Sequence, residues 1–275
     1  MTSALAGKTA IVSGSGRGIG AAIAHKLAAN GAAVVVNDLD ADAAQQVADE
    51  ITAAGGRAAV CAGSVTEEGF ADRFVATAVD TFGGLDIIVN NAGYTWDTVV
   101  QNMGDEQWDA ILDVHLKAPF QILRAAQPVI SAAAKRERDQ GDPVTRKVVN
   151  ISSLAGLFGN AGQANYSAGK AGILGLTKAI AKEWGRYRVT VNAVAFGLIQ
   201  TRLTSSATDD STIDIAGQEI KVGVNPMILQ AAQHLAPLGR LGTVEEAAGA
   251  VYLLCLPESD YITGEVLTCS GGLVG

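Results

Sequence analysis

The sequence contains little proline, cysteine, aromatic residue or charge. Of its 275 residues only 6 are proline and 3 are cysteine, while 5% are aromatic and 17% are charged. Disorder is excluded because it requires low hydrophobicity with high charge, whereas 48% of this chain is hydrophobic. The scarcity of proline excludes a proline-rich linker protein. The composition instead provides a core for one large α/β domain or two small ones.

The cysteines Cys61, Cys255 and Cys269 are odd in number and far apart, and no C-x-x-C or metal-ligand spacing is present. We interpret them as reduced packing residues of a cytoplasmic protein, not as a disulfide framework or a metal site. The N-terminal residues show no basic segment followed by an apolar one, so no signal peptide is expected. The longest stretch without charge, Val148–Gly169, is interrupted by Asn, Ser and Gly. We therefore expect no membrane span.

Positive charge is also in deficit. The formal net charge is −8 and the isoelectric point is near 4.9. Nucleic acids and anionic lipid surfaces attract basic proteins. We therefore expect neither nucleic acid nor membrane among the partners.

Short apolar runs alternate with longer amphipathic segments along the whole chain. We expect strands at 8–13, 33–37, 57–61, 85–90, 147–152, 188–194 and 265–268. We expect helices at 18–30, 41–54, 67–82, 105 to about 138, 162–184 and 243–256. Nearly continuous apolar strands separated by helices are typical of a parallel sheet covered on both faces. The sequence therefore predicts an α/β fold, a single-domain Rossmann-type doubly wound sheet of about seven strands over residues 1–275.

Two segments do not follow this alternation. Residues 131–146 are polar and of mixed charge, and we interpret them as a solvated helix end with a loop, the alternative being a partner-binding excursion. Residues 202–239 mix polar with apolar residues and are too long for an ordinary connection. We interpret that second segment as a lid over an active site.

A glycine-rich turn follows the first expected strand and precedes the first helix. Its glycines, Gly14, Gly18 and Gly20, let a diphosphate approach the backbone amides of the helix N-terminus. Asp38 closes the second strand, where a carboxylate can bind the adenosine ribose hydroxyls and repel a 2′-phosphate. Arg17 opposes this preference, because a cation there could pair with a 2′-phosphate. We give the carboxylate priority and predict NAD, with NADP the lesser possibility.

Tyr166 and Lys170 are four residues apart in an expected helix, so both side chains project from one face. Ser153 follows the fifth strand, and the carboxyl ends of parallel strands are where such folds bind ligands. A nearby ammonium favours the phenolate, so we expect Lys170, together with the positive nicotinamide ring of a bound cofactor, to lower the pKa of Tyr166 towards about 7. These three residues are the catalytic candidates.

These features together resemble the short-chain dehydrogenase/reductase family. The resemblance covers about residues 5–272 and rests on Gly14-x-x-x-Gly18-Ile19-Gly20, Asn90-Asn91-Ala92-Gly93, Ser153, Tyr166-x-x-x-Lys170 and the run VNAVAFG at 191–197. The run GNAGQANY at 159–166 is similar to the branch of 3-oxoacyl-ACP reductases and 3-hydroxyacyl-CoA dehydrogenases.

The resemblance implies a role for each matching residue. Tyr166 would be the general acid or base, Lys170 would assist it and bind the nicotinamide ribose, and Ser153 would bind the substrate oxygen. The implied cofactor-binding residues are Gly14, Arg17, Gly18, Ile19, Gly20, Asp38, Leu39, Ser64, Val65, Asn91, Ala92, Gly93, Tyr166, Lys170, Ile199 and Thr201. The chemistry would be hydride transfer coupled to proton transfer.

The chain departs from the family pattern at three places. Ser64-Val65 stands where relatives often have Asp before Val, and Phe196-Gly197 stands where they usually have Pro-Gly. His115 occupies the place of an active-site asparagine. An imidazole could keep a proton relay there and would titrate near neutral pH, so we add His115 to the catalytic candidates. The alternative is a histidine that only pins a kinked helix by bonding a backbone carbonyl.

We expect the substrate pocket to be formed by Tyr94, Trp96, Leu154, Phe196 and the lid. Their apolar character favours an acyl or ring substrate over a sugar. The predicted function is an NAD(H)-dependent oxidoreductase interconverting a secondary alcohol and a ketone, with a 3-hydroxyacyl/3-oxoacyl thioester as the expected substrate. The alternatives are a dehydrogenase of a steroid or terpenoid, or a non-catalytic dinucleotide sensor. We expect a small-molecule substrate and a homo-oligomer, a tetramer by resemblance.

Overall fold

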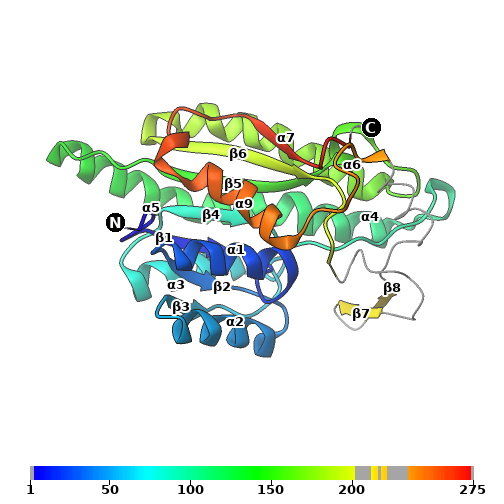
Figure 1. The fold of residues 1–275 in the computed structure, drawn as a ribbon, viewed down its shortest axis with the longest axis horizontal. Coiled ribbons are helices and arrows are strands. Elements are labelled where there is room, and N and C mark those ends of the chain that lie inside the picture. Colours follow the sequence, from blue (N-terminus) through cyan, green and yellow to red (C-terminus); the bar gives the residue numbers. More distant parts are fainter. Residues whose placement is uncertain (1–2, 202–211, 216–217, 222–234, 274–275) are drawn as a thin grey trace.

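Seven parallel strands form the central sheet of the computed structural model, which describes residues 3–201, 212–215, 218–221 and 235–273 (Figure 1). Their order is β3-β2-β1-β4-β5-β6-β9. The strands are β1 (Thr9–Val12), β2 (Ala33–Val36), β3 (Arg57–Val60), β4 (Ile87–Asn90), β5 (Arg146–Ser153), β6 (Val189–Phe196) and β9 (Val266–Cys269). Side chains of β1, β2 and β4 are fully buried because helices cover both faces. The predicted doubly wound α/β fold is confirmed.

Helices cover the sheet in two layers. One layer contains α1 (Gly18–Ala29), α2 (Ala41–Ala53) and α9 (Val244–Cys255), whose apolar side chains share a core cluster with Val12 and Val36. The other contains α3 (Phe70–Phe82), α5 (Ala118–Gln140) and α7 (Ala164–Trp184), which share a second cluster with Ile11 and Val35. Alternate residues of each strand thus point into opposite cores. Figure 1 shows α1 and α9 on the near face of the sheet.

The sheet reverses its direction of growth between β1 and β4. From β1 the chain adds β2 and β3 on one side, and then returns to add β4, β5 and β6 on the other. The loops that leave β1 and β4 at their carboxyl ends therefore diverge. A crevice at this switch point is where open α/β sheets bind ligands. The same edge receives the ends of β2, β3, β5 and β6.

The helix expected from 105 to about 138 is interrupted. It divides into α4 (Asp105–Leu112), a π-helical segment (Asp113–Lys117) and α5. π-Bulges inside α-helices are frequent at functional sites. His115, which stands where the family pattern has an asparagine, lies in this π-helical segment.

The segment 131–146 is a helix end with a loop, but it is not wholly solvated. The α5 helix ends at Gln140, and Gly141 caps it in the left-handed conformation with a φ of 77°. Arg146 is only 5% exposed and forms two hydrogen bonds with Glu137 at 2.9 and 2.5 Å. An ion pair therefore fastens the end of α5 to the start of β5.

Several short elements were missed by the sequence analysis. They are α6 (Leu154–Phe158), the antiparallel pair β7 (Thr212–Ile215) and β8 (Gln218–Lys221), and 3₁₀ turns at Val100–Asn102, Gly185–Tyr187 and Pro257–Ser259. The predicted lid, 202–239, lies mostly outside the described residues. The three cysteines are free, and Cys61 and Cys255 are buried, as expected of packing residues. Within the described ranges no helix is long and apolar enough to cross a membrane.

Candidate active site

The turn between β1 and α1 leaves a helix N-terminus open. Gly14 and Gly18 have positive φ angles of 61° and 55°. A Cβ on Gly20 would lie 2.0 Å from the Gly14 carbonyl oxygen, so only glycine fits there. Arg17 occupies the N-cap of α1 without a side-chain capping bond, and the first turn contains no acidic residue. These features fit a diphosphate group, which the free amides and the helix dipole attract.

The loop after β4 is bonded directly to this turn. The Ser13 hydroxyl accepts hydrogen bonds from the amides of Asn91 and Ala92, both at 3.0 Å. The Asn91 side chain donates to the carbonyls of Ser13 and Gly14 at 3.0 and 2.9 Å. The predicted cofactor residues at 14–20 and 91–93 therefore lie together. Ile19 contributes to the site through packing, since its side chain contacts the core below α1.

Asp38 lies against the same turn. Its Oδ2 accepts from the Gly16 amide and its Oδ1 from the Asp40 amide, each at 3.1 Å. Each carboxylate oxygen has a further lone pair that a ribose hydroxyl could use. Leu39 is 49% exposed beside it. The Arg17 guanidinium bonds Asp40 at 2.5 Å instead of standing free.

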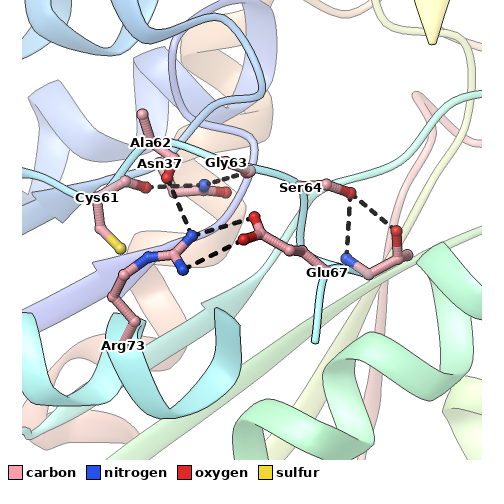
Figure 2. A network of polar contacts seen from close by, with 8 residues as sticks. Asn37, Cys61, Ala62, Gly63, Ser64, Glu67 and Arg73 are labelled. Carbon is pink, nitrogen blue, oxygen red and sulfur yellow. Dashed lines mark hydrogen bonds and ion pairs between the residues drawn. The ribbon is translucent and has the colours of Figure 1, made fainter. Parts of the chain in front are cut away.

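The loop after β3, which carries Ser64 and Val65, is fastened from two sides (Figure 2). The Asn37 amide donates to the carbonyls of Cys61 and Gly63, both at 3.0 Å. Below it, Arg73 pairs with Glu67 at 3.2 Å, and its NH2 nitrogen lies 3.4 Å from the Ala62 carbonyl (Figure 2). Val65 is 7% exposed and packs in the core, whereas the Ser64 hydroxyl contacts Thr66 at 2.8 Å. Of the predicted pair, the Ser64 side chain is the more accessible.

Two residues that hold the loop after β3 in place were not predicted from the sequence. Arg73 and Glu67 are six residues apart, and no motif marks either of them. Gly63 has a φ of 130°, which strains any other residue, and a Cβ there would lie 2.8 Å from the Arg73 guanidinium. Only the glycine itself could have been a signal.

Tyr166 and Lys170 project from α7 towards the end of β5. The Lys170 ammonium lies 5.6 Å from the centroid of the Tyr166 ring and donates to the Ile151 carbonyl at 2.8 Å. The Ser152 hydroxyl donates to the Lys170 carbonyl at 2.7 Å, which joins the strand to the helix. Ser153 caps α6, its hydroxyl accepting from the Ala155 amide at 3.2 Å. Ser153 also forms a hydrogen bond with Tyr166, so the structure brings these three of the four catalytic candidates together.

Burial shifts the pKa values of both Tyr166 and Lys170. Burial raises the pKa of Tyr166 to about 12, although a hydrogen bond from Ser153 opposes the rise. Burial also lowers the pKa of Lys170 to about 7. In the protein alone the pKa of Tyr166 is therefore raised and not lowered, because loss of hydration is the largest effect. The lowering expected from Lys170 together with a bound nicotinamide ring stays a prediction. The phenol keeps its proton at neutral pH.

His115 lies between the loop after β4 and Tyr166. Its Nε2 donates to the Tyr94 carbonyl at 2.8 Å, and its ring meets the Tyr166 ring edge-on at 5.0 Å. A Cβ on Gly93 would lie 2.1 Å from His115 Cε1, so the ring fits only against glycine. Nδ1 is buried without a hydrogen-bond partner among the described residues. With Nε2 donating, Nδ1 is the unprotonated acceptor of a neutral imidazole.

The predicted titration of His115 near neutral pH is wrong. The side chain is 3% exposed. Burial, and then the charge of Lys170, hold the pKa of His115 well below 6.5. The bond to the Tyr94 carbonyl is the contact that the alternative interpretation expected.

The predicted pocket residues divide into two groups. Tyr94, Trp96 and Leu154 are half-buried near the ends of β4 and β5. Phe196 does not join them, because it is 5% exposed and packs in the core under α9. Ile199 packs in the same core, where a β-bridge links it to Gly242. Thr201 is half-buried at the last residue before the undescribed segment.

Asn165 is a site residue that the sequence analysis missed. It is fully buried, and its amide nitrogen donates to the carbonyls of Trp96 and Gln107 at 3.2 and 3.1 Å. Its oxygen accepts from the Tyr166 amide at 2.8 Å. Asn165 therefore holds the Trp96 loop against the start of α7. Its position directly before Tyr166 was the available signal.

Over the described part of the chain no group of three or more His, Cys, Asp or Glu side chains is placed to hold a metal ion.

Comparisons with known proteins add to the geometry. Residues 14–274 match the family described as enoyl-(acyl carrier protein) reductase. A 3-oxoacyl-[acyl-carrier-protein] reductase of Synechocystis sp. is 38% identical over 273 residues, covering 98% of both chains. The corresponding reductase FabG of Vibrio cholerae is 38% identical over 269 residues, again with 98% of both chains covered. The short-chain reductase protein NovJ of Streptomyces niveus is 38% identical over 263 residues, which are 96% of this chain and 92% of NovJ.

Proposed function

Because the chain belongs to the short-chain dehydrogenase/reductase family, we propose that it is an NAD(H)-dependent reductase of 3-oxoacyl thioesters. It is an oxidoreductase acting on a CH–OH group, and it requires a nicotinamide dinucleotide. The observation that carries the proposal is the meeting of Ser153, Tyr166 and Lys170 at the end of β5, beside the open glycine turn.

Tyr166 is proposed as the proton donor to the ketone oxygen. When bound, the nicotinamide supplies the hydride that the carbonyl carbon accepts. The oxygen must gain one proton, and a phenol with a pKa of about 12 carries that proton at neutral pH. A donor that remains protonated suits the reducing direction. Ser153 would bind the same oxygen through its hydroxyl.

Lys170 and His115 are assigned supporting roles. The Lys170 ammonium, with a pKa of about 7, can exchange a proton at neutral pH and would bind the nicotinamide ribose. His115 would hold the loop after β4 through the Tyr94 carbonyl and present Nδ1 as an acceptor. It would do so as a neutral ring.

The dinucleotide would bind at the switch point between β1 and β4. The diphosphate would lie on the amides at Gly18, Ile19 and Gly20, and Asp38 would bind the adenosine ribose. We propose NAD because a carboxylate at that ribose repels a 2′-phosphate. The remaining cofactor contacts proposed are Arg17, Leu39, Ser64, Val65, Asn91, Ala92, Gly93, Ile199 and Thr201.

The substrate class rests on two kinds of support. Several similar proteins are named as 3-oxoacyl-[acyl-carrier-protein] reductases. The half-buried side chains of Tyr94, Trp96 and Leu154 offer apolar contact to an acyl chain. We also propose that the protein forms a homo-oligomer of four copies.

A substrate panel tests this function. Acetoacetyl-CoA, longer 3-oxoacyl thioesters on CoA and on acyl carrier protein, steroids and small alcohols would be assayed with NAD(H) and with NADP(H). The proposal predicts the highest kcat/KM for a 3-oxoacyl thioester with NADH. Faster turnover of a steroid or a small alcohol would replace the substrate class. A protein that binds NADH and turns over none of the panel would support a dinucleotide sensor.

A further inference from the structure

We infer that Asp40 is a cofactor-selectivity residue, which acts by holding Arg17 away from a 2′-phosphate. The inference rests on the proposed function, because it concerns the adenosine end of the proposed dinucleotide site. Asp38 is the selectivity residue that the sequence indicates. Asp40 is a second one, and it acts through another side chain, so it is a positioning residue.

Arg17 is the cation placed to favour NADP. It lies within the glycine turn, directly before the first residue of α1. An arginine near the adenosine ribose is the usual way to accommodate a 2′-phosphate. In this structure its guanidinium donates to Asp40 Oδ2 at 2.5 Å. The charge is therefore already neutralised by a residue of the chain.

Asp40 is held in the position that this pairing needs. It is the N-cap of α2, and its Oδ1 accepts from the amides of Asp42 and Ala43 at 3.0 and 3.2 Å. Its own amide donates to Asp38 Oδ1 at 3.1 Å. Oδ2 is thus left for Arg17, whose hydrogen bond is the largest cause lowering the pKa of Asp40. The pairing with Arg17 therefore favours the charged form of the Asp40 carboxylate.

The space beside this ion pair is unfavourable to an additional phosphate. A cavity of about 420 Å³ opens between α1 and α2 and is lined by Arg17, His25, Asp40, Asp42 and Glu50, among others. Three of these side chains are carboxylates, and Glu50 lies 3.1 Å from His25. A 2′-phosphate entering from the ribose would face several negative charges and one engaged guanidinium. Like charges at this range oppose binding.

Replacing Asp40 by asparagine separates charge from structure. Asparagine is as good an N-cap as aspartate, so Asp40→Asn keeps the start of α2. It removes one negative charge and releases Arg17. A free arginine forms charge-assisted bonds with a phosphate, and at an exposed site we expect up to about a fivefold gain in NADP affinity relative to NAD.

The test measures binding of NAD⁺ and NADP⁺ by titration calorimetry. The variants are Asp40→Asn, Arg17→Ala and the double variant, with Asp42→Asn as the control that removes one charge from the same cavity without touching Arg17. Asp40→Ser provides a second capping residue should Asp40→Asn be unstable. Thermal unfolding checks that α2 keeps its cap.

Support requires that Asp40→Asn raise the NADP/NAD affinity ratio by up to about fivefold, clearly more than Asp42→Asn does, and that Arg17→Ala remove this gain. An unchanged ratio, a gain equal to that of Asp42→Asn, or a gain that survives Arg17→Ala would overturn the inference while leaving the proposed function intact. Failure of the parent protein to bind either dinucleotide would overturn the proposed function itself.

Discussion

The ring of His115 joins three parts of the site: the π-helical segment that carries it, the loop after β4, and the Tyr166 ring. Its contacts explain two glycines. A side chain at Gly93 would strike the ring, and a Cβ at Gly169 on α7 would lie 3.2 Å from the His115 Cβ. The histidine therefore has a structural role whatever part it takes in proton transfer.

Two substitutions at His115 separate these roles. His115→Ala loses the bond to the Tyr94 carbonyl and a buried ring, and we expect a loss of about 2–4 kcal/mol in the free energy of unfolding. His115→Asn retains a donor and should retain most of the activity. Because the pKa of His115 lies well below 6.5, the pH–rate profile of His115→Asn should have the same acid limb as the parent. A displaced acid limb would mean that His115 titrates in the working range.

Lys170 makes stability depend on pH. Its pKa of about 7 in the folded protein lies below the ordinary 10.5, so between these values the unfolded chain binds more protons. The contribution of Lys170 to the free energy of unfolding therefore rises with pH across that window and is least favourable below pH 7. Lys170→Met removes this dependence. The stability of the variant relative to the parent should fall by up to a few kcal/mol from pH 6.5 to 9.

Urea unfolding at several pH values would measure this difference. Lys178→Met is the control, since Lys178 is exposed on the same helix. A pH-independent difference between Lys170→Met and the parent would mean that Lys170 keeps its charge when buried.

Among the elements, α5 and β5 are fastened together by an ion pair that is largely withdrawn from water. The Arg146 side chain is 6% exposed and that of Glu137 is 19% exposed, and Arg146 also lies 3.9 Å from Asp86. Its guanidinium donates further to the Leu85 carbonyl at 3.1 Å. Removing one partner of such a pair leaves a buried charge uncompensated.

Glu137→Gln should therefore lower the free energy of unfolding by about 3 kcal/mol at neutral pH. Arg146 holds the pKa of Glu137 below its usual value, so the stabilisation is present at neutral pH and is lost as pH falls through that lowered pKa. Asp113→Asn, which breaks the exposed pair with Lys117, should cost less than 1 kcal/mol. Equal losses for the two variants in denaturant titrations would contradict this account.

The arrangement of elements was largely predictable from the sequence, because apolar runs bounded by glycine mark buried parallel strands. Each predicted strand end lies within two residues of the observed one. The π-helical segment was not predictable, since its residues His115 and Leu116 pack against Gly169 and Gly172 of α7, which are distant in the sequence. The five residues of α6 were also missed, because so short a helix has no periodic pattern.

In the active site, too, some features were predictable from the sequence and others depend on contacts between distant residues. The helical spacing of Tyr166 and Lys170, the position of Ser153 at a strand end and the family resemblance predicted that these three residues lie together. They could not give the pKa of Tyr166, because burial depends on the whole surrounding fold. Contacts such as Asn165 with Trp96 join residues about 70 positions apart, and periodicity carries no information about them.

At the scale of the whole molecule, two long helices present outward faces that suit pairing. On α7 the exposed positions Ala171, Gly175 and Ala179 recur every four residues, and Phe120 is 43% exposed on α5. Small residues allow helices to approach closely. These faces are where the proposed homo-oligomer would associate.

Sedimentation velocity at micromolar concentration should therefore give an oligomer, and Gly175→Arg should shift it towards smaller species. Gly84→Arg is the control: a Cβ there also meets no atom within 4 Å, but Gly84 lies between α3 and β4. A monomer mass for the parent, or the same shift in both variants, would contradict an interface on α7.

The central claim is that Tyr166 donates the proton in a reduction carried out with NADH. The most direct measurement is the rate of NADH oxidation by acetoacetyl-CoA for the parent, Tyr166→Phe and the control Tyr187→Phe, whose hydroxyl contacts Gln127 at 3.2 Å. Affinity for NADH is measured in parallel by fluorescence. The account predicts a rate about a thousandfold lower in Tyr166→Phe alone, with a far smaller change in NADH affinity. Turnover by Tyr166→Phe at the parental rate would contradict it.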